Sequence, residues 1–317
     1  MAEIRQPQTP TGGRDDLRID ASRCLRMRFS ASSCRRCADI CPHRAVSLDG
    51  ILSINPNHCT GCLLCTAECP VGALEQSKDF SVCLAQVSRV PEPILGCIRS
   101  SDSSHATLAC LGGLSEEHLV ALCHSGSGKL TLNLTACSDC PNGTMIPQLQ
   151  HRLDVLAEAG LSGGSGHVVV VESAEGLRFR DETVNRRSFF KSLRNSLFLS
   201  AAVVLSSTSE SSERRTAYGG KRLPVRRELL SGARKSMSQE QAARVERRFD
   251  SCISFDENCT GCQGCVAICP TGALQTGLSD KAPTFDQTLC TGCRLCGDFC
   301  LDGALRISAG ETRDGAD

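Results

Sequence analysis

The residues best suited to chemistry in this sequence are its cysteines, of which there are 23 in 317 residues. Most follow one repeated run, C-x-x-C-x-x-C-x-x-x-C. Three complete copies occupy residues 57–74, 257–274 and 288–305. A degenerate fourth copy lies upstream, where Cys34, Cys37 and Cys41 keep the later spacing and Cys24 replaces the first cysteine. The four copies therefore form two pairs, one toward each end of the chain.

This spacing is typical of [4Fe-4S] ligation, in which three thiolates close around one cubane and the fourth reaches the other cluster of the pair. Gly61, Gly261 and Gly292 lie inside the loops, where the absence of a Cβ lets backbone N–H groups approach the cluster sulfurs. The sequence therefore predicts four [4Fe-4S] clusters, with ligation crossed within each pair.

Crossed ligation assigns four cysteines to each of four sites, which we name A to D. In the first pair, site A comprises Cys24, Cys34, Cys37 and Cys69, and site B comprises Cys41, Cys59, Cys62 and Cys65. In the second pair, site C comprises Cys269, Cys290, Cys293 and Cys296, and site D comprises Cys259, Cys262, Cys265 and Cys300. Two departures matter: the gap between Cys24 and Cys34 is wide, and Leu301 stands where the other copies have Pro.

Structural zinc and disulfides are the alternatives for so many thiols. Zinc ribbons separate two C-x-x-C pairs widely and have no use for tandem runs with a third and a fourth cysteine. Met1 to Asp20 lacks the apolar region of a cleavable signal, which predicts a reducing cytoplasm where disulfides are disfavoured. The longest apolar run, Leu197 to Leu205, is about half of the roughly 18 residues that a membrane span needs. We therefore expect no membrane span.

The paired runs resemble bacterial-type 2x[4Fe-4S] dicluster ferredoxins over residues 20–78 and 250–310. That resemblance implies a small fold of two pseudo-symmetric halves packed on the clusters. Leu48 to Ile54 and the stretch around Thr284 and Phe285 would be short strands between repeats. The expected fold class is α+β ferredoxin-like dicluster modules at both ends of a central α/β domain.

Residues 90–175 alternate between strand and helix patterns and predict the central α/β domain. Strands are expected at residues 93–97, 106–110, 129–137 and 167–172, and helices from Ser115 to about Cys123 and from Ile146 to Ala159. Cys97, Cys110 and Cys137 follow or end predicted strands, with Cys140 one turn later, and ligands gather at such strand ends. Cys83 and Cys123 are interpreted as small core hydrophobes.

This segment resembles the delta-subunit domain found with methyl-viologen-reducing hydrogenases and heterodisulfide reductases. The resemblance rests on the run Ala109 to Leu114, the helix after it, and the strand ending in Cys137 and Cys140. It implies a [2Fe-2S] cluster held by Cys97, Cys110, Cys137 and Cys140, here called the central site. The closing C-x-x-C is shorter than the family's spacing, so the alternative is a domain that kept the fold and some buried cysteines.

Residues 176–249 form a basic linker, with 17 Lys and Arg against 7 Asp and Glu over residues 178–248. The usual interpretation is a solvated connector, although such a segment could also dock on an acidic partner or fold over the modules. Nucleic acid is not an expected partner, because aromatic and basic residues do not interleave.

The linker also contains Arg186-Arg187, followed by Phe189 and Phe190. This R-R-x-F-F element looks like a twin-arginine export signal, but its position after 185 residues argues against that use. It also resembles the element preceding the clusters in the cytoplasmic ferredoxin-type accessory protein of periplasmic nitrate reductase. An ordinary amphipathic helix is the alternative.

Several one-electron centres in one chain predict a relay to or from a larger redox protein or oxidoreductase complex. An accessory role in maturing a molybdenum-type redox enzyme is the alternative and rests on the R-R-x-F-F resemblance. An enzyme would need a substrate site or organic cofactor, and the sequence has no G-x-G-x-x-G fingerprint and no P-loop. No catalytic residues are predicted, and neither the direction of electron flow nor the potentials follow from the sequence.

Overall fold

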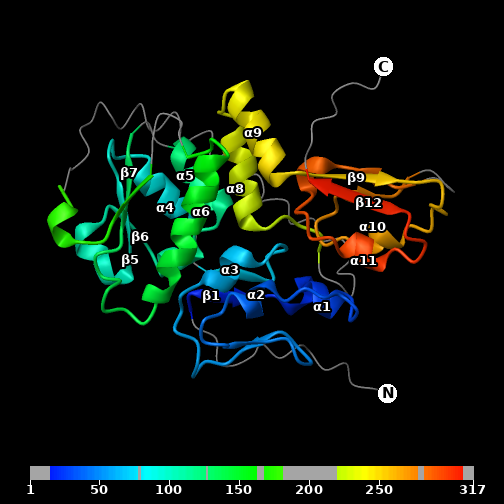
Figure 1. Cartoon of the computed structure of the whole chain (residues 1–317), viewed down its shortest axis with the longest axis horizontal. Helices are drawn as coiled ribbons and strands as arrows, with labels where there is room; N and C mark the ends of the chain where they lie inside the picture. Colours follow the sequence, from blue (N-terminus) through cyan, green and yellow to red (C-terminus); the bar gives the residue numbers. More distant parts are fainter. Residues whose placement is uncertain are drawn as a thin grey trace.

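The computed structural model describes residues 15–77, 80–125, 128–162, 168–180, 220–277 and 282–309. A central parallel sheet with its helices lies on one side, the N-terminal module lies below it, and the C-terminal module lies on the other side (Figure 1). The R-R-x-F-F element and the apolar run from Leu197 fall outside the described residues.

Two small antiparallel sheets and four short helices build the N-terminal module. Its elements are β1 (Leu17–Ile19), a 3-10 turn (Ala21–Arg23), α1 (Leu25–Arg28), α2 (Arg36–Asp39), β2 (Val46–Ser47), β3 (Ser53–Ile54), α3 (Leu64–Glu68) and β4 (Leu74–Gln76). Strand β1 pairs with β4, with Leu17 opposite Gln76, and β2 pairs with β3.

The single strand expected over Leu48 to Ile54 is wrong, because that segment contains a turn, with Gly50 at φ 75°, and only β3 is extended.

The C-terminal module repeats this plan. Its elements are β9 (Ser251–Phe255), α10 (Gly264–Ile268), β10 (Leu274–Gln275), β11 (Thr284–Phe285), α11 (Leu295–Phe299) and β12 (Leu305–Ala309). Strand β9 pairs with β12, and β10 pairs with β11, which includes the expected strand at Thr284 and Phe285. Each module is therefore closed by a strand before its first repeat pairing with a strand after its second.

The cysteine repeat is also a repeat of backbone conformation. Leu63, Gln263 and Arg294, each directly after the second cysteine of a complete copy, all adopt left-handed φ angles of 58–66°. Three residues after the fourth cysteine, Gly72, Gly272 and Gly303 are left-handed as well, and Arg44 takes the same conformation in the degenerate copy. The degenerate run thus folds like the complete ones, at the cost of a non-glycine residue in the left-handed region.

A four-stranded parallel sheet in the order β6-β5-β7-β8 forms the middle of the molecule, as expected. Its strands are β5 (Ile94–Cys97), β6 (Ala106–Leu108), β7 (Leu130–Asn133) and β8 (Val168–Val171), and its helices are α4 (Phe80–Val87), α5 (Glu116–Ser125) and α6 (Ile146–Glu158). Helix α5 begins after Ser115, whose Oγ accepts a hydrogen bond from the His118 N–H at 3.3 Å. Cys83 and Cys123 are both buried and Cys83 belongs to this core, in keeping with their interpretation as small core hydrophobes.

The interpretation of the basic segment as a solvated connector is wrong for residues 220–249. These residues form α8 (Val225–Arg234) and α9 (Gln239–Phe249), and α8 lies against α5 (Figure 1). Leu229 and Leu230 of α8 join the core of the central domain. The basic composition of the segment concealed this burial, because the buried residues of α8 include Arg226 and Arg227 beside Leu229 and Leu230.

Candidate iron-sulfur centres

None of the 23 cysteines forms a disulfide, so their thiols are not consumed by cross-links. Among the described residues, no three His, Cys, Asp or Glu side chains converge on one point as ligands of a single metal ion must. A tetrahedral zinc site would need its sulfurs at about 2.3 Å from one centre, whereas a cubane spreads four thiolates over its corners.

Site A residues come together in the N-terminal module, chiefly around Cys37 in α2. Burial raises the pKa of the Cys37 thiol to about 12, and three neighbouring thiolates add to the shift. These neighbours are Cys69, Cys24 and Cys34. The structure thus places the four thiols predicted for site A as mutual neighbours, across the wide gap after Cys24.

Site B residues gather around Cys65 in α3. Burial raises the pKa of the Cys65 thiol well above its ordinary value, and the thiolates of the surrounding cysteines raise it further. Those cysteines are Cys62, Cys37, Cys59 and Cys41. Three of the four are the predicted companions of Cys65, and the fourth, Cys37, belongs to site A, so the two sites adjoin.

Site C residues come together between α11 and the turn after α10. Burial raises the pKa of the Cys293 thiol to about 12, with further contributions from the Cys269 and Cys290 thiolates. Cys296 has the same neighbours and a raised pKa. Cys269 differs: burial acts to raise its pKa, but hydrogen bonds from the backbone of residues 271, 272 and 274 and from the Thr271 hydroxyl outweigh burial and lower it.

Site D is the most open of the four. Burial raises the pKa of the Cys265 thiol, and Cys262 and Cys259 are its neighbouring thiolates. Cys300 packs against the same apolar cluster as Cys265. Cys262 is exposed, whereas the other cysteines of the chain are buried or half-buried.

Backbone N–H groups point at cysteine sulfurs in equivalent positions. The N–H of Ala45 donates to Cys41 Sγ at 3.3 Å, and the N–H of Ala73 donates to Cys69 Sγ at 3.2 Å. In both cases the donor lies four residues after the fourth cysteine of a repeat. Such bonds stabilise thiolate and raise the potential of a cluster held there, so the donor chemistry of these loops fits iron-sulfur ligation.

The four cysteines predicted for the central site line one cavity of about 190 Å³ at the carboxyl end of the sheet. Burial raises the pKa of the Cys110 thiol to about 12, and the neighbouring thiolates of Cys62, Cys97 and Cys137 add to the shift. Thr60 and Gly61 of the site B loop line the same cavity. A four-thiol cavity fits a small cluster, and it opens directly beside site B.

Glycines allow the central domain to approach the site B loop this closely. A Cβ on Gly112 would lie 2.3 Å from the carbonyl oxygen of Cys62, and one on Gly113 would lie 2.6 Å from Gln76 Nε2. The Gln76 side chain instead donates to the Gly113 carbonyl at 2.8 Å. The run from Ala109 to Leu114, singled out in the sequence for its cysteine, therefore also forms the contact between domain and module.

Apolar residues join site A to the C-terminal module. Cys24, Cys37 and Cys69 share a core cluster with Ile268 and Leu295, and Cys293 and Phe299 pack against it. The rings of Phe29 and Phe299 meet edge to face with centroids 5.2 Å apart. The buried Arg28 guanidinium donates to the Ile268 carbonyl at 3.4 Å. Sites A and C therefore face each other across the boundary between modules.

Two consecutive arginines of α8 contact both modules, which sequence analysis missed. Arg226 donates to the carbonyls of Thr66 and Cys69, and Arg227 donates to the carbonyl of Cys290 at 2.6 Å. Both side chains are buried, at 7% and 6% exposure. Each guanidinium also has a carboxylate partner, Glu117 at 3.2 Å for Arg226 and Asp250 at 3.4 Å for Arg227. The only sequence signal was the pair of arginines that begins two residues after Pro224.

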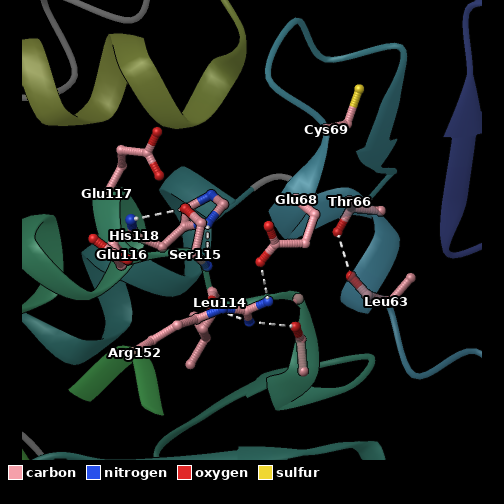
Figure 2. Close-up of polar contacts among 12 residues, drawn as sticks. Leu63, Thr66, Glu68, Cys69, Leu114, Ser115, Glu116, Glu117, His118 and Arg152 are labelled. Atoms are coloured by element: carbon pink, nitrogen blue, oxygen red, sulfur yellow. Dashed lines mark hydrogen bonds and ion pairs between the residues drawn. The ribbon is translucent and has the colours of Figure 1, made fainter. Parts of the chain in front are cut away.

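A second polar junction, centred on Arg152, joins the N-terminal module to the central domain (Figure 2). Arg152 of α6 pairs with Glu68 of α3 at 2.9 Å and donates to the carbonyls of Gly112 and Leu114. Burial acts to raise the pKa of Glu117, but the Arg226 and Arg227 guanidiniums outweigh it and lower that pKa to about 2. Burial lowers the pKa of His118 to about 3, so this imidazole is neutral in the folded protein.

Three charged residues next to predicted ligands do not contribute buried charge. Arg35, Arg36 and His58 are all exposed, and Arg35 pairs with Asp39 at 3.3 Å. The buried positive charge near the sites instead includes Arg23, Arg28, Arg226 and Arg227.

Two comparisons with known proteins bear on these centres. Residues 32–73 match the family model of the 4Fe-4S dicluster domain, and residues 255–275 match that of the 4Fe-4S binding domain. The chain contains two 4Fe-4S ferredoxin-type domains. Over 63 residues it is 32% identical to pyruvate synthase subunit PorD of Methanocaldococcus jannaschii, a match covering 19% of this chain and 65% of that subunit.

The ferredoxin-type domains and this similarity support an iron-sulfur electron-transfer function. The matched length is just under two thirds of the relative, and no solved structure matches the chain. Among the described residues, none of the helices is both long and apolar enough to cross a membrane.

Proposed function

We propose that this protein relays single electrons through four [4Fe-4S] clusters at sites A to D, to or from a larger oxidoreductase complex. Bound clusters would supply reversible one-electron transfer, because each cubane changes oxidation state with little structural change. The observation that carries the proposal is the grouping of thiols by fours at sites A, B and C and of Cys259, Cys262 and Cys265 at the more open site D, which follows the crossed ligation expected from the repeats.

The contacts between sites give the relay an order. The central cavity shares its lining with the site B loop, and Cys65 of site B neighbours Cys37 of site A. Site A faces site C through the apolar contacts of α1 with α11 and its neighbours. Site D lies beyond site C in the same module. We therefore propose the order central site, B, A, C, D, with a [2Fe-2S] cluster at the central site as the fifth centre.

The partner is proposed from similarity alone. The similar subunit from Methanocaldococcus jannaschii carries the name of a pyruvate synthase, a multisubunit oxidoreductase by that name. We propose that this chain also serves an oxidoreductase complex. The buried residues around the sites would hold the clusters at fixed separation and exclude water, which lowers the reorganisation that accompanies each transfer.

The deciding experiment is the iron and acid-labile sulfide content of anaerobically purified protein, together with EPR of the reduced form. Four cubanes give about sixteen irons per chain, and a loaded central site raises the value to about eighteen. The quadruple variant Cys97→Ser, Cys110→Ser, Cys137→Ser and Cys140→Ser should lose only the last two. Zinc without sulfide would contradict the proposed function.

A further inference from the structure

Three loops of this chain share the sequence Cys-Thr-Gly-Cys, and they differ in what covers them. The loop of residues 59–62 lies under the central domain: Cys62 is 8% exposed, and Gly112 approaches its carbonyl closely. The loop of residues 290–293 is covered by α8 and the N-terminal module, through the Arg227 bond to Cys290 and the packing of Cys293. Another part of the chain therefore packs on two of the three loops.

The third loop, residues 259–262, has no such cover among the described residues. Thr260 and Cys262 are exposed. Beside them lies Leu301, 98% exposed, at the position where the covered loop's repeat has the buried Pro70. Leu301 is therefore an apolar side chain that is accessible to a partner protein beside a cluster-binding loop.

Charge around this loop is predominantly negative. The Thr260 hydroxyl donates to Asp302 Oδ2 at 3.0 Å, which ties the loop to the turn that carries Leu301. Glu257 and Asp302 are both exposed on this surface. Asp256, 3.6 Å from Arg306, adds a carboxylate whose charge is already paired. Thiolate ligation would make the site more negative.

We infer that the surface formed by residues 257–262 and 301–302, the site D surface, is the docking site of a redox partner that presents basic side chains around an apolar contact. This inference rests on the proposed function and adds the place and the chemistry of the partner contact. The partner would pack on the site D loop as the central domain packs on the site B loop. Leu301 would supply the apolar contact, and Glu257 and Asp302 the charges that attract and orient the partner.

The test uses the fully loaded, reduced protein and a lysine-rich c-type cytochrome as the basic one-electron acceptor. Stopped-flow mixing at low salt follows one electron from the protein to each ferric haem. The variant Glu257→Gln with Asp302→Asn removes two charges and keeps an acceptor for Thr260. It should react about tenfold more slowly at low ionic strength and approach the native rate at high salt. Leu301→Ala should slow the reaction at every salt concentration.

A matched control removes two exposed carboxylates from the central domain, Glu158→Gln with Glu175→Gln. It should leave the rate nearly native. Carbodiimide cross-linking to the same cytochrome gives a second readout that does not depend on turnover. Cross-links should form at Glu257 and Asp302, and mass spectrometry locates them.

The outcomes separate the two proposals. Equal rates for both double variants, or cross-links that avoid residues 257 and 302, would overturn the docking inference while leaving the relay intact. Loss of iron and sulfide in the native protein would instead overturn the proposed function itself. Iron content and EPR of each variant, measured before mixing, show that its clusters are loaded.

Discussion

The two ferredoxin-type modules share one backbone fold but differ in how much of each is covered by the rest of the chain. In both, an outer antiparallel pair closes the module and short helices carry the third cysteine of each repeat. The N-terminal module is enclosed by the central domain, by α8 and by its sister module. The C-terminal module is enclosed on the site C side alone and leaves site D open. In the proposed relay, the same sequence motif would pass electrons inside the molecule in one module and would form the end of the relay in the other.

Removal of one ligand from each module should give the largest difference between them. Cys65→Ser removes a buried thiol that neighbours both site A and site B, so we expect loss of about four irons or more. Because cluster binding contributes directly to folding, the thermal midpoint should fall by about 10 °C or more. Cys262→Ser, at the exposed loop, should lose at most about four irons and leave the midpoint nearly native. Iron analysis and thermal circular dichroism measure both; equal losses would show that the modules are not differently enclosed.

Arg226→Met tests the buried charge between the modules. It leaves Glu117, whose side chain is 14% exposed, without this guanidinium and two carbonyls without their donor. Breaking a buried pair in this way should cost about 3–5 kcal/mol of unfolding free energy. Loss of a positive charge beside Cys69 should also lower the reduction potential of site A, followed by EPR during a redox titration.

Two further variants separate charge from packing in that test. Arg226→Lys keeps the charge and should restore most of the potential but only part of the stability. Arg306→Met removes a guanidinium that is 75% exposed and should change neither quantity appreciably. If Arg226→Met left the potential of every cluster unchanged, the buried arginines would be structural only.

Gly112→Ala tests how closely the central domain must pack against the N-terminal module. The added Cβ would lie 2.3 Å from the Cys62 carbonyl oxygen, so backbone would have to move. We expect a loss of about 1–3 kcal/mol, measured by urea denaturation, and faster hydrogen exchange at the site B loop. Gly176→Ala is the matched control, because its nearest neighbour, Val171 Cγ1, would be at 3.4 Å. Equal stability of the two variants would contradict the close approach.

Acid should lower the free energy of unfolding, by a smaller amount than these substitutions. The folded-state pKa of His118 is about 3, below its ordinary 6.5, so the unfolded chain binds its proton first. Stability from this group is complete above about pH 6.5 and falls as the pH drops toward 3. Glu117, with a pKa of about 2 against 4.5, adds a loss that begins below about pH 4.5. Urea midpoints near pH 7, 5.5 and 4.5 should decline, and His118→Gln should flatten the upper part of that decline.

The local structure could be predicted from the sequence where short-range chemistry decides it. Ser115 marked the start of α5, and the apolar runs located the parallel strands. The strand expected across Leu48 to Ile54 was wrong, because Asp49-Gly50 is a strong turn signal and turns the chain between β2 and β3. Both Leu48 and Leu52 are buried, so the pattern reported burial correctly and conformation incorrectly.

The contacts between modules could not be predicted, because they join residues far apart in the chain. Arg226 and Cys69 are 157 positions apart, and the basic composition around Arg226 is typical of exposed segments. The approach of Gly112 to Cys62 depends in the same way on how two separately folded units meet. The predicted ligand sets A to D remain a prediction from spacing, and the grouping of their thiols in the structure supports it.

The helix α8 also sets the order in which the molecule can be completed during synthesis. Residues 15–180 leave the ribosome before Leu229 and Leu230, which pack on the central core, and before Arg226, which bonds to Cys69. Until α8 emerges, the nascent chain keeps part of its central core and the side of site A open to the solvent and to the proteins that deliver iron and sulfide. The late arrival of one helix thus leaves a period for cofactor insertion and then ends it.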